Sequence, residues 1–509
     1  MGIDRPLDVL FVNADSSLAA YQGLSETFSA IEPPTWSLLL AASCRSRGFG
    51  VGILDCTAER LDVKDACSRI NDAAPRLVCF VVYGQNPNSG TTNMIGAAAL
   101  ADRLKEEHPS LRICFVGSHV SALPLEVLQL PSVDFVLLNE GVYALWNLLG
   151  TDLESGLRAI RGIGFKDNGH AVLNDAERVV PQERMDADLP GYAWDLLPRR
   201  AAPLDLYRAH FWHANFDHGR RTPFAALNTS LGCRFRCDFC MINIVNRTDN
   251  GPDVSAASSP LMRFWSPEFM LRQFDELAAM GVTTVRLSDE MFFLDKRYFE
   301  PLLEGLVARN HGFHMWAYSR VDTVRPRYLE LFRQAGIDWL ALGVEAANQE
   351  IRREVSKGTF EEVNIREVVR VVRDSGINVI SNYIFGFPDD TRETMQQTLD
   401  LALELNTEMA NMYPCQALPG SPLHVEAKRN GWPLPDSFAG YGFLSYESQP
   451  LPTRHLSAAE VLRFRDDAWH TYFTNPAYLT LVESKFGGEQ RANVEGMARH
   501  RLRRRLLGD

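Results

Sequence analysis

The sequence lacks any apolar run long enough to cross a bilayer, which takes about 20 residues. The longest candidate, Leu77 to Tyr83, is far shorter. The first residues, MGIDRPLDVLFVN, carry an early acid and no apolar stretch with a small-residue cleavage site, as a secretory signal would have. We therefore expect a cytoplasmic protein with no membrane span.

An excess of basic residues is also missing. Lys and Arg number 52 against 64 for Asp and Glu, so the formal net charge is −12. Because nucleic-acid-binding proteins normally present a basic footprint, no nucleic-acid partner is expected. The hydrophobic share of 46% excludes long disorder. At roughly 150 residues per domain, the chain predicts two to four domains.

Cysteine is scarce and odd in number, at nine residues. A disulfide framework is not expected in a large chain without a secretion signal. Six cysteines stand singly, mostly among apolar residues, and are predicted to be buried thiols; they are Cys44, Cys56, Cys67, Cys79, Cys114 and Cys415. The other three, Cys233, Cys237 and Cys240, lie close together.

The amino-terminal part alternates short apolar runs with helix-length segments. Runs rich in Val, Ile, Leu and Phe are typical of parallel strands buried on both faces. Strands are predicted at 8–13, 51–55, 77–84, 112–118 and 134–141, with helices such as 36–47 and 96–108 between them. The pattern predicts an α/β fold, a doubly wound Rossmann-like domain over residues 1–149.

Residues 150–222 form a predicted connecting segment with a hairpin at 163–173, whose turn is Asp167 to Gly169. A second alternating series fills residues 223–430. Its strands are predicted at 224–230, 282–290, 314–320, 339–345, 378–388 and 409–419. Six βα units predict a partial (β/α)6 TIM-like barrel, open on one side.

Two helices of this barrel carry start signals. Ser266 is a predicted N-cap followed by Pro267, for a helix that ends at Gly281, and Asp390 with Glu393 suggests a capping box. Residues 431–509 are predicted to be a C-terminal helical region. Its basic tail, ARHRLRRRLLGD, is expected to be a solvated, frayed helix end.

The clustered cysteines follow the first barrel strand at spacings of four and three residues. Three thiolates at this spacing can wrap around one [4Fe–4S] cluster and leave one iron open to an exchangeable ligand. Zinc is the competing metal, since His210, His213 or His218 could supply a fourth ligand. Three unrelated core cysteines are a weaker reading, because loops at strand ends carry a barrel's chemistry.

The motif Cys-x3-Cys-x2-Cys, with an aromatic residue before the last cysteine, resembles the radical S-adenosylmethionine superfamily. The resemblance implies that the open iron chelates S-adenosylmethionine and that an electron from the cluster cleaves it to a 5′-deoxyadenosyl radical. It implies cosubstrate contacts by Phe239, Ser288, Asp289, Arg320, Glu345, Ile384 and Gly386. The superfamily's Gly-Gly-Glu segment after strand two is absent, and Ser288-Asp289-Glu290 stands there.

The amino-terminal domain resembles the cobalamin-binding domain fused ahead of such barrels. The segments that carry this resemblance are Glu32 to Trp36, RGFGVGILD, Gly117 to Pro124 and VDFVLLNEG. They imply cobalamin contacts by Pro33, Pro34, Thr35, Gly117, Ser118, His119, Ser121 and Gly141. The Asp-x-His-x-x-Gly signature of a cobalt-ligating histidine is absent, so His119 is expected not to bind cobalt and the lower cobalt face is expected to stay open.

The resemblance implies a cobalamin-dependent radical S-adenosylmethionine methyltransferase that methylates an unactivated carbon of a small molecule, a specialised metabolite or lipid. Its cofactors would be the [4Fe–4S] cluster, S-adenosylmethionine and cobalamin, with flavodoxin or ferredoxin as electron donor. The expected pocket walls are Tyr318, Tyr383, Tyr413, Cys415 and residues 432–446. Redox, cyclisation or rearrangement chemistry, phosphorus methylation, and a non-catalytic cobalamin or iron–sulfur sensor remain alternatives.

Overall fold

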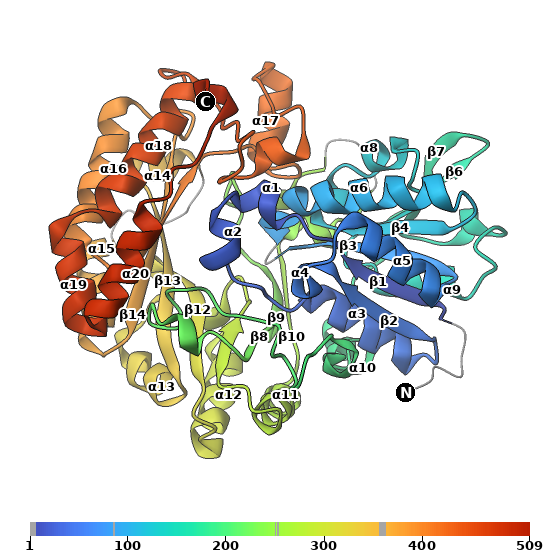
Figure 1. Ribbon diagram of the computed structural model, residues 1–509, viewed down its shortest axis with the longest axis horizontal. Coiled ribbons are helices and arrows are strands. Elements are labelled where there is room, and N and C mark those ends of the chain that lie inside the picture. Colours follow the sequence, from blue (N-terminus) through green and yellow to red (C-terminus); the bar gives the residue numbers. More distant parts are fainter. Residues whose placement is uncertain (1–6, 85–86, 250, 252–253, 356–362) are drawn as a thin grey trace.

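The computed structural model describes residues 7–84, 87–249, 251, 254–355 and 363–509. Two sheets lie side by side, the amino-terminal one in blue and cyan and the second from green to orange (Figure 1). No helix in these residues has the length and apolarity that a membrane span requires.

The amino-terminal sheet has seven strands in the order β2-β1-β3-β4-β5-β6-β7. The five predicted strands are confirmed and pair in parallel; they are β1 Val9–Asn13, β2 Val51–Asp55, β3 Leu77–Val82, β4 Arg112–Gly117 and β5 Phe135–Leu137. The predicted hairpin also forms, as β6 Ile163–Asp167 and β7 His170–Leu173. Because β6 pairs antiparallel with β5, the start of the connecting segment extends this sheet.

Alternate residues of these strands enter two separate cores, as expected for a sheet buried on both faces. Cys79 packs in the core shared with α3, and its neighbour Phe80 packs in the core shared with α5 and α6. The helices of this part are α1 Ser17–Tyr21, α2 Leu24–Thr27, α3 Thr35–Ser46, α4 Cys56–Glu59, α5 Val63–Ala73, α6 Gly90–Glu107, α7 Ser118–Ala122, α8 Pro124–Gln129, α9 Val142–Leu149 and α10 Met185–Asp188.

The second sheet has six parallel strands in the order β15-β14-β13-β12-β11-β8 and curls into a half-barrel. The six predicted strands are confirmed as β8 Phe224–Leu227, β11 Thr284–Leu287, β12 His314–Arg320, β13 Ile337–Glu345, β14 Asn378–Phe385 and β15 Met409–Pro414. An unpredicted antiparallel pair, β9 Ser230–Cys233 and β10 Leu261–Phe264, lies beside it. Its helices are α11 Pro267–Ala279, α12 Lys296–Arg309, α13 Leu329–Gln334, α14 Gln349–Glu354, α15 Ile365–Asp374, α16 Arg392–Leu405 and α17 Pro422–Asn430.

One of the two predicted helix starts is confirmed. The Ser266 hydroxyl accepts a hydrogen bond from the Phe269 amide at 3.2 Å and caps α11. The capping box at Asp390 is wrong, because Thr391 and Thr394 form the box of α16 one residue later. Asp390 instead accepts the Gly386 and Phe387 amides at 3.0 and 2.9 Å, so its carboxylate holds the turn after β14.

The carboxy-terminal helices α18 Ala458–Phe473, α19 Pro476–Phe486 and α20 Gly488–Ala498 pack along the β14–β15 side of the half-barrel (Figure 1). The basic tail after α20 is largely exposed, as predicted, but it is not a frayed helix end. Arg504 is fully buried and donates to Asp466 on α18 at 2.8 and 2.9 Å and to the Ser445 carbonyl at 2.8 Å. Through these hydrogen bonds to the Asp466 carboxylate and the Ser445 carbonyl, Arg504 anchors the tail to the rest of the protein.

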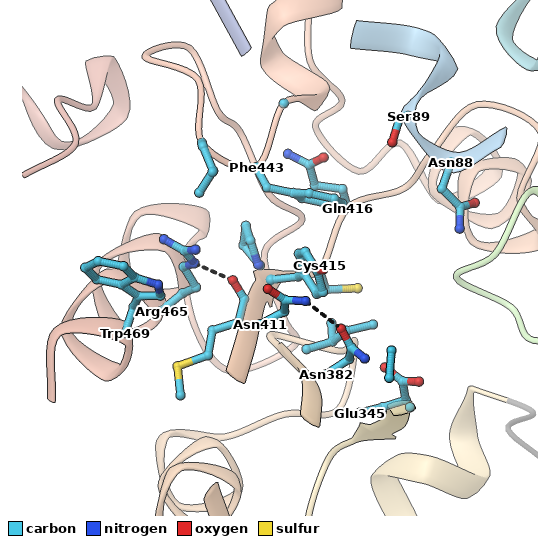
Figure 2. Close-up of a pocket in the computed structure, with 18 of the residues that line it drawn as sticks. Asn88, Ser89, Glu345, Asn382, Asn411, Cys415, Gln416, Phe443, Arg465 and Trp469 are labelled. Atoms are coloured by element: carbon cyan, nitrogen blue, oxygen red, sulfur yellow. Dashed lines mark hydrogen bonds between the residues drawn. The ribbon is translucent and has the colours of Figure 1, made fainter. Parts of the chain in front are cut away.

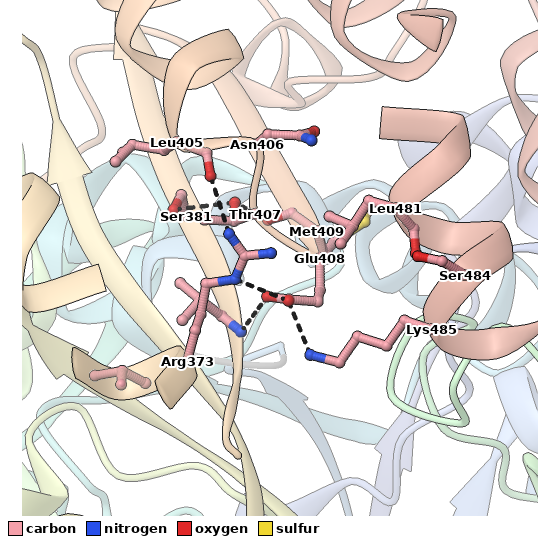
Figure 3. Close-up of polar contacts among 12 residues, drawn as sticks. Arg373, Ser381, Leu405, Asn406, Thr407, Glu408, Met409, Leu481, Ser484 and Lys485 are labelled. Atoms are coloured by element: carbon pink, nitrogen blue, oxygen red, sulfur yellow. Dashed lines mark hydrogen bonds and ion pairs between the residues drawn. The ribbon is translucent and has the colours of Figure 1, made fainter. Parts of the chain in front are cut away.

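Glu408 joins several elements where β15 begins (Figure 3). Its fully buried carboxylate pairs with Arg373 of α15 at 3.0 Å and with Lys485 of α19 at 2.9 Å, and it accepts the Val379 amide at 3.0 Å. These contacts lie at the amino-terminal end of the strands, where barrels carry stability rather than chemistry.

Two buried ion pairs link the amino-terminal part to the elements of the second half. Arg263 of β10 meets Glu140, which follows β5, at 2.8 Å. Arg286 of β11 meets Glu32, which precedes α3, at 2.5 Å. All four side chains are at most 7% exposed, so the interface is closed at both points.

Candidate functional site

A cavity of about 620 Å³ is lined by both halves of the molecule. This is within the range of small-molecule and cofactor sites. Its walls come from α1 and α2, the turn before α6, the cysteine loop, the ends of β12 to β15, α18 and the basic tail. Figure 2 shows Asn411 and Asn382 as neighbours among the lining residues, with Glu345 beyond Asn382.

All three clustered cysteines line this cavity. Cys233 ends β9, where its amide donates to the Asn243 side chain at 3.1 Å and its sulfur accepts from the Phe235 amide at 3.5 Å. Burial raises the pKa of Cys233 to about 11 and the pKa of Cys240 to about 12. At neutral pH these thiols are therefore protonated unless a cation stabilises the thiolate form. The iron ions of a cluster would supply that positive charge.

Two side chains contact the ligand sulfurs from outside the loop. Arg320 Nη1 lies 3.6 Å from Cys237 Sγ, and its guanidinium stacks 3.8 Å from the centre of the Phe235 ring. Asn88, from the amino-terminal domain, accepts the Met241 amide at 3.1 Å and places Nδ2 3.8 Å from Cys240 Sγ. Donors to the sulfurs are typical of iron–sulfur sites.

The donor set fits a cluster with an open iron better than it fits zinc. In the described residues, no three His, Cys, Asp or Glu side chains, the three cysteines included, lie close enough together to hold a single metal ion. The candidate histidines have other contacts: His210 pairs with Glu32 at 3.1 Å, His213 is buried against the His314 carbonyl, and His218 stacks on an aromatic ring. Three thiols spaced around an open cavity suit a larger inorganic core.

The residues expected to contact the cosubstrate separate into two groups. Five line the cavity, namely Phe239, Ser288, Arg320, Glu345 and Ile384. Asp289 and Gly386 lie behind its wall. Asp289 accepts the Thr229 amide at 2.9 Å and the hydroxyls of Thr229 and Ser230 at 2.8 and 2.5 Å, and burial raises its pKa to about 6.

Glu345 reaches the cavity through an irregularity in its strand. The pairing of β13 with β14 shifts between Gly343 and Glu345, and Glu345 has a φ of 66°, in the left-handed region. Non-glycine residues held there often mark functional sites. Beside it, Asn411 donates to Asn382 at 3.0 Å across the floor of the cavity (Figure 2).

Glu290 was not among the predicted site residues. It lines the cavity, burial raises its pKa to about 8, and its Oε2 atom has no hydrogen-bond partner in the described protein. The buried Ser288 hydroxyl is likewise unpartnered there. Together they offer acceptors to an incoming cationic group. The sequence located the Ser-Asp-Glu segment, but only the fold shows which acid faces inward.

The eight residues expected to contact cobalamin lie in the described part of the chain, and none lines the cavity. Pro33 and Pro34 precede α3, which begins at Thr35. Gly117 ends β4, Ser121 accepts the Asn139 amide at 2.8 Å, and Gly141 starts α9 in the left-handed conformation.

Ser118 and His119 support the turn that does reach the cavity. The Ser118 hydroxyl donates to the Pro87 carbonyl at 2.5 Å, and His119 Nδ1 lies 3.1 Å from the Thr91 hydroxyl. Burial lowers the pKa of His119 to about 3. The neighbouring residues Asn88, Ser89 and Thr92 form the cavity wall.

The structure places part of the expected pocket wall on the cavity. Tyr318, Tyr413, Cys415 and residues 441–444 line it, whereas residues 432–440, 445 and 446 do not, and Tyr383 is buried.

Two family models match the chain. The Radical SAM superfamily matches residues 227–402 and the B12 binding domain matches residues 21–149. The first range holds the cysteine loop and the half-barrel strands β11 to β14, and the second holds β2 to β5 of the Rossmann-like sheet.

The chain is 24% identical over 454 residues to an uncharacterized methyltransferase of Pyrococcus horikoshii, covering 88% of this chain and 89% of that protein. It is 26% identical over 463 residues to the anaerobic magnesium-protoporphyrin IX monomethyl ester cyclase of Rubrivivax gelatinosus, covering 88% and 75%. The radical S-adenosylmethionine methyltransferase TsrM from Kitasatospora setae, solved with cobalamin and a [4Fe–4S] cluster, has the same fold, with a TM-score of 0.65, 18% identity, and coverage of 96% and 99%.

Proposed function

Since the chain belongs to the cobalamin-dependent radical S-adenosylmethionine enzymes, we propose that it transfers a methyl group to an unactivated carbon of a small-molecule substrate. Its cofactors are a [4Fe–4S] cluster, S-adenosylmethionine and cobalamin. When bound, the cluster and S-adenosylmethionine supply a 5′-deoxyadenosyl radical and cobalamin carries the methyl group.

The observation that carries the proposal is one cavity shared by the three thiols and a wall of the B12-binding domain. Cys233, Cys237 and Cys240 hold the cluster. Asn88 and Ser89 lie where cobalamin would meet the barrel, and the eight predicted cobalamin residues act behind them; for example, Ser118 fixes the Pro87 carbonyl in this turn.

The cosubstrate is held by residues on the same wall as the cysteines. Glu290 and Ser288 offer unpartnered acceptors to its ammonium group. Arg320 donates through Nε and Nη2 to Asp322 at 2.8 Å each, and its Nη1, 3.6 Å from Cys237 Sγ, is the proposed donor to the carboxylate. Phe239 and Ile384 supply apolar surface for its adenine. Glu345 and Asn382 add polar groups to the cavity lining.

An acidic flavodoxin or ferredoxin is the proposed electron donor. Arg234 and Arg236 are exposed and stand next to cluster ligands in the sequence. Arg234 lies 3.8 Å from Asp295, whereas Arg236 has no ion pair in the described residues. In a chain with a net charge of −12, Arg236 therefore gives an acidic carrier a local point of attraction.

A radical cyclisation without methyl transfer is the second candidate, favoured by the likeness to the Rubrivivax gelatinosus cyclase. Both reactions form 5′-deoxyadenosine, but only methyl transfer also demethylates S-adenosylmethionine to S-adenosylhomocysteine.

The test uses reduced, anaerobically purified holoenzyme, S-adenosylmethionine with a deuterated methyl group, and a panel of small-molecule acids. We expect S-adenosylhomocysteine, 5′-deoxyadenosine and a deuterated methyl product. Formation of 5′-deoxyadenosine without S-adenosylhomocysteine would contradict methyl transfer and favour cyclisation or redox chemistry. Retention of cobalamin with neither nucleoside formed would favour a sensor. The Cys237→Ala variant is the control for background turnover.

A further inference from the structure

The basic tail forms one wall of the cavity. Arg504 anchors it to Asp466 and to the Ser445 carbonyl. The Arg503 amide also donates to the Gln22 side chain, beside α1, at 3.1 Å. Held at these points, the tail places Arg501, Leu502 and Leu507 on the cavity.

This wall has an excess of positive charge. Arg463 and Arg465 of α18 line the cavity together with Arg501. In the described residues, no ion pair engages Arg463 or Arg501, whereas Asp466 is paired with both Arg465 at 2.7 Å and Arg504 at 2.8 Å.

The other titratable groups leave this excess in place. Asp467 is the remaining acid of the wall. Burial and the nearby Arg501 lower the pKa of His470, so it is neutral at pH 7. His500 stacks edge-on against Phe28 at 5.4 Å. Arg463 helps to lower the pKa of Glu460, one turn earlier on α18, but Glu460 does not line the cavity. On the cavity wall itself, the positive charge of Arg463 and Arg501 exceeds the one negative charge of Asp467.

The positive wall lies away from the cluster ligands. The cysteine loop follows β8, at one edge of the six-stranded sheet, and α18 packs on β15 at the other edge. In Figure 2, Asn88, which touches the cysteine loop, lies on one side, and Arg465 and Trp469 lie on the opposite side. A ligand at this wall would not compete with the cosubstrate.

Aromatic rings stand between the two ends. Tyr413 and Phe443 have ring centroids 4.9 Å apart, and both line the cavity with Trp469. Such rings provide apolar contact area at low entropic cost.

We propose that this end of the cavity binds the anionic group of an aromatic acid, with Arg463 and Arg501 as its cations and the rings against its body. The inference rests on the proposed function for the identity of the cavity as the substrate site. It assigns the basic tail a role in choosing the substrate.

The experiment measures binding and needs no turnover, so it stands apart from the test of methyl transfer. Holoenzyme is titrated with 8-anilinonaphthalene-1-sulfonate and with its neutral counterpart N-phenyl-1-naphthylamine, and the dissociation constants are taken from fluorescence. Variants are Arg501→Met and Arg463→Met. The matched control is Arg499→Met, since Arg499 is exposed in the same segment but does not line the cavity.

Each cavity variant should weaken sulfonate binding about fivefold, which corresponds to about 1 kcal/mol, and leave the neutral probe within about twofold. The control should change neither constant. Equal losses for both probes, an unchanged sulfonate constant, or the same loss in the control would each overturn the proposal. Because Arg463 and Arg501 are exposed, these variants should fold normally, which circular dichroism checks.

Discussion

Asn88 and Cys240 are 152 residues apart in sequence, yet Nδ2 of the amide lies 3.8 Å from the sulfur. The same side chain accepts the Met241 amide at 3.1 Å. The B12-binding domain thus contacts the loop that holds the cluster. A displacement of the Asn88 turn would therefore alter the surroundings of Cys240.

Replacing Asn88 by Leu should lower the reduction potential of the cluster by tens of millivolts. A donor to a ligand sulfur stabilises the more negative, reduced cluster, and Leu offers none. A redox titration followed by electron paramagnetic resonance measures the shift. Ser89→Ala, at the adjacent cavity residue, should retain the wild-type potential. An unchanged potential in Asn88→Leu would show that the contact only positions the loop.

Each of the three predicted ligands should be required for the cluster to bind. Cys233→Ala, Cys237→Ala or Cys240→Ala should each abolish the broad iron–sulfur absorbance and reduce bound iron and sulfide to background, because three thiolates are needed to hold the cube. Cys415→Ala is the control, since this buried thiol also lines the cavity. A variant of the three that kept its full cluster would remove that cysteine from the ligand set.

Reversing the charge of Arg236 should slow reduction by an acidic flavodoxin by about tenfold at low ionic strength, because electrostatic attraction sets the encounter rate. Stopped-flow absorbance measures this rate. Photoreduced deazaflavin, a small reductant, should reduce Arg236→Glu as fast as the wild type. The control Arg272→Glu changes an exposed arginine on α11; an equal loss there would point to net charge rather than to a docking site.

His119 should make the fold sensitive to acid. Burial lowers its pKa to about 3, whereas a histidine in the unfolded chain has a pKa of about 6.5. Below pH 6.5 the unfolded chain takes up a proton that the folded chain refuses, so stability falls as the pH drops. Between pH 7.5 and 5 the loss should be about 2 kcal/mol.

Urea unfolding measures the free energy of unfolding at pH 7.5 and at pH 5. Between these two values, His119→Gln should lose about 2 kcal/mol less stability than the wild type loses. His170→Gln changes an exposed histidine and should behave as the wild type does. Identical pH dependence in all three proteins would contradict burial of a neutral His119.

Glu408→Gln should destabilise the protein by about 2 kcal/mol, because a fully buried carboxylate loses two cationic partners. The loss is moderated because Arg373 and Lys485 are 29% and 34% exposed and can rehydrate. Thermal or urea unfolding provides the measurement. Glu404→Gln breaks an exposed pair with Arg366 and should cost less than about 0.5 kcal/mol. Equal effects of the two changes would refute a special role for Glu408.

The strands were predictable because their apolar runs are buried on both faces, as at Cys79 and Phe80. The orientation of single polar residues was not. Asp289 turns away from the cavity because Thr229 and Ser230, distant in sequence, donate to it, and this leaves Glu290 facing inward. Sequence spacing carries no information about those donors.

The basic tail was misjudged for a similar reason. Its charges are typical of a solvated end, but Arg504 finds Asp466 and becomes fully buried. The residues predicted to contact cobalamin remain a prediction, and none of them lines the cavity. The positions of Asn88 and Ser89 on the cavity depend on how the turns of the amino-terminal domain pack against the second half, which the sequence does not show.

The buried pairs Arg263–Glu140 and Arg286–Glu32 have a consequence for the order of assembly. Parting the two halves would strand four charges that are each at most 7% exposed, which is costly unless water reaches all of them. A molecule as large as cobalamin must therefore either enter through the mouth of the cavity or be captured before the halves close. In the second case its release would require the halves to part, at the cost of exposing these charges, whereas cobalamin that enters through the mouth can leave by the same route.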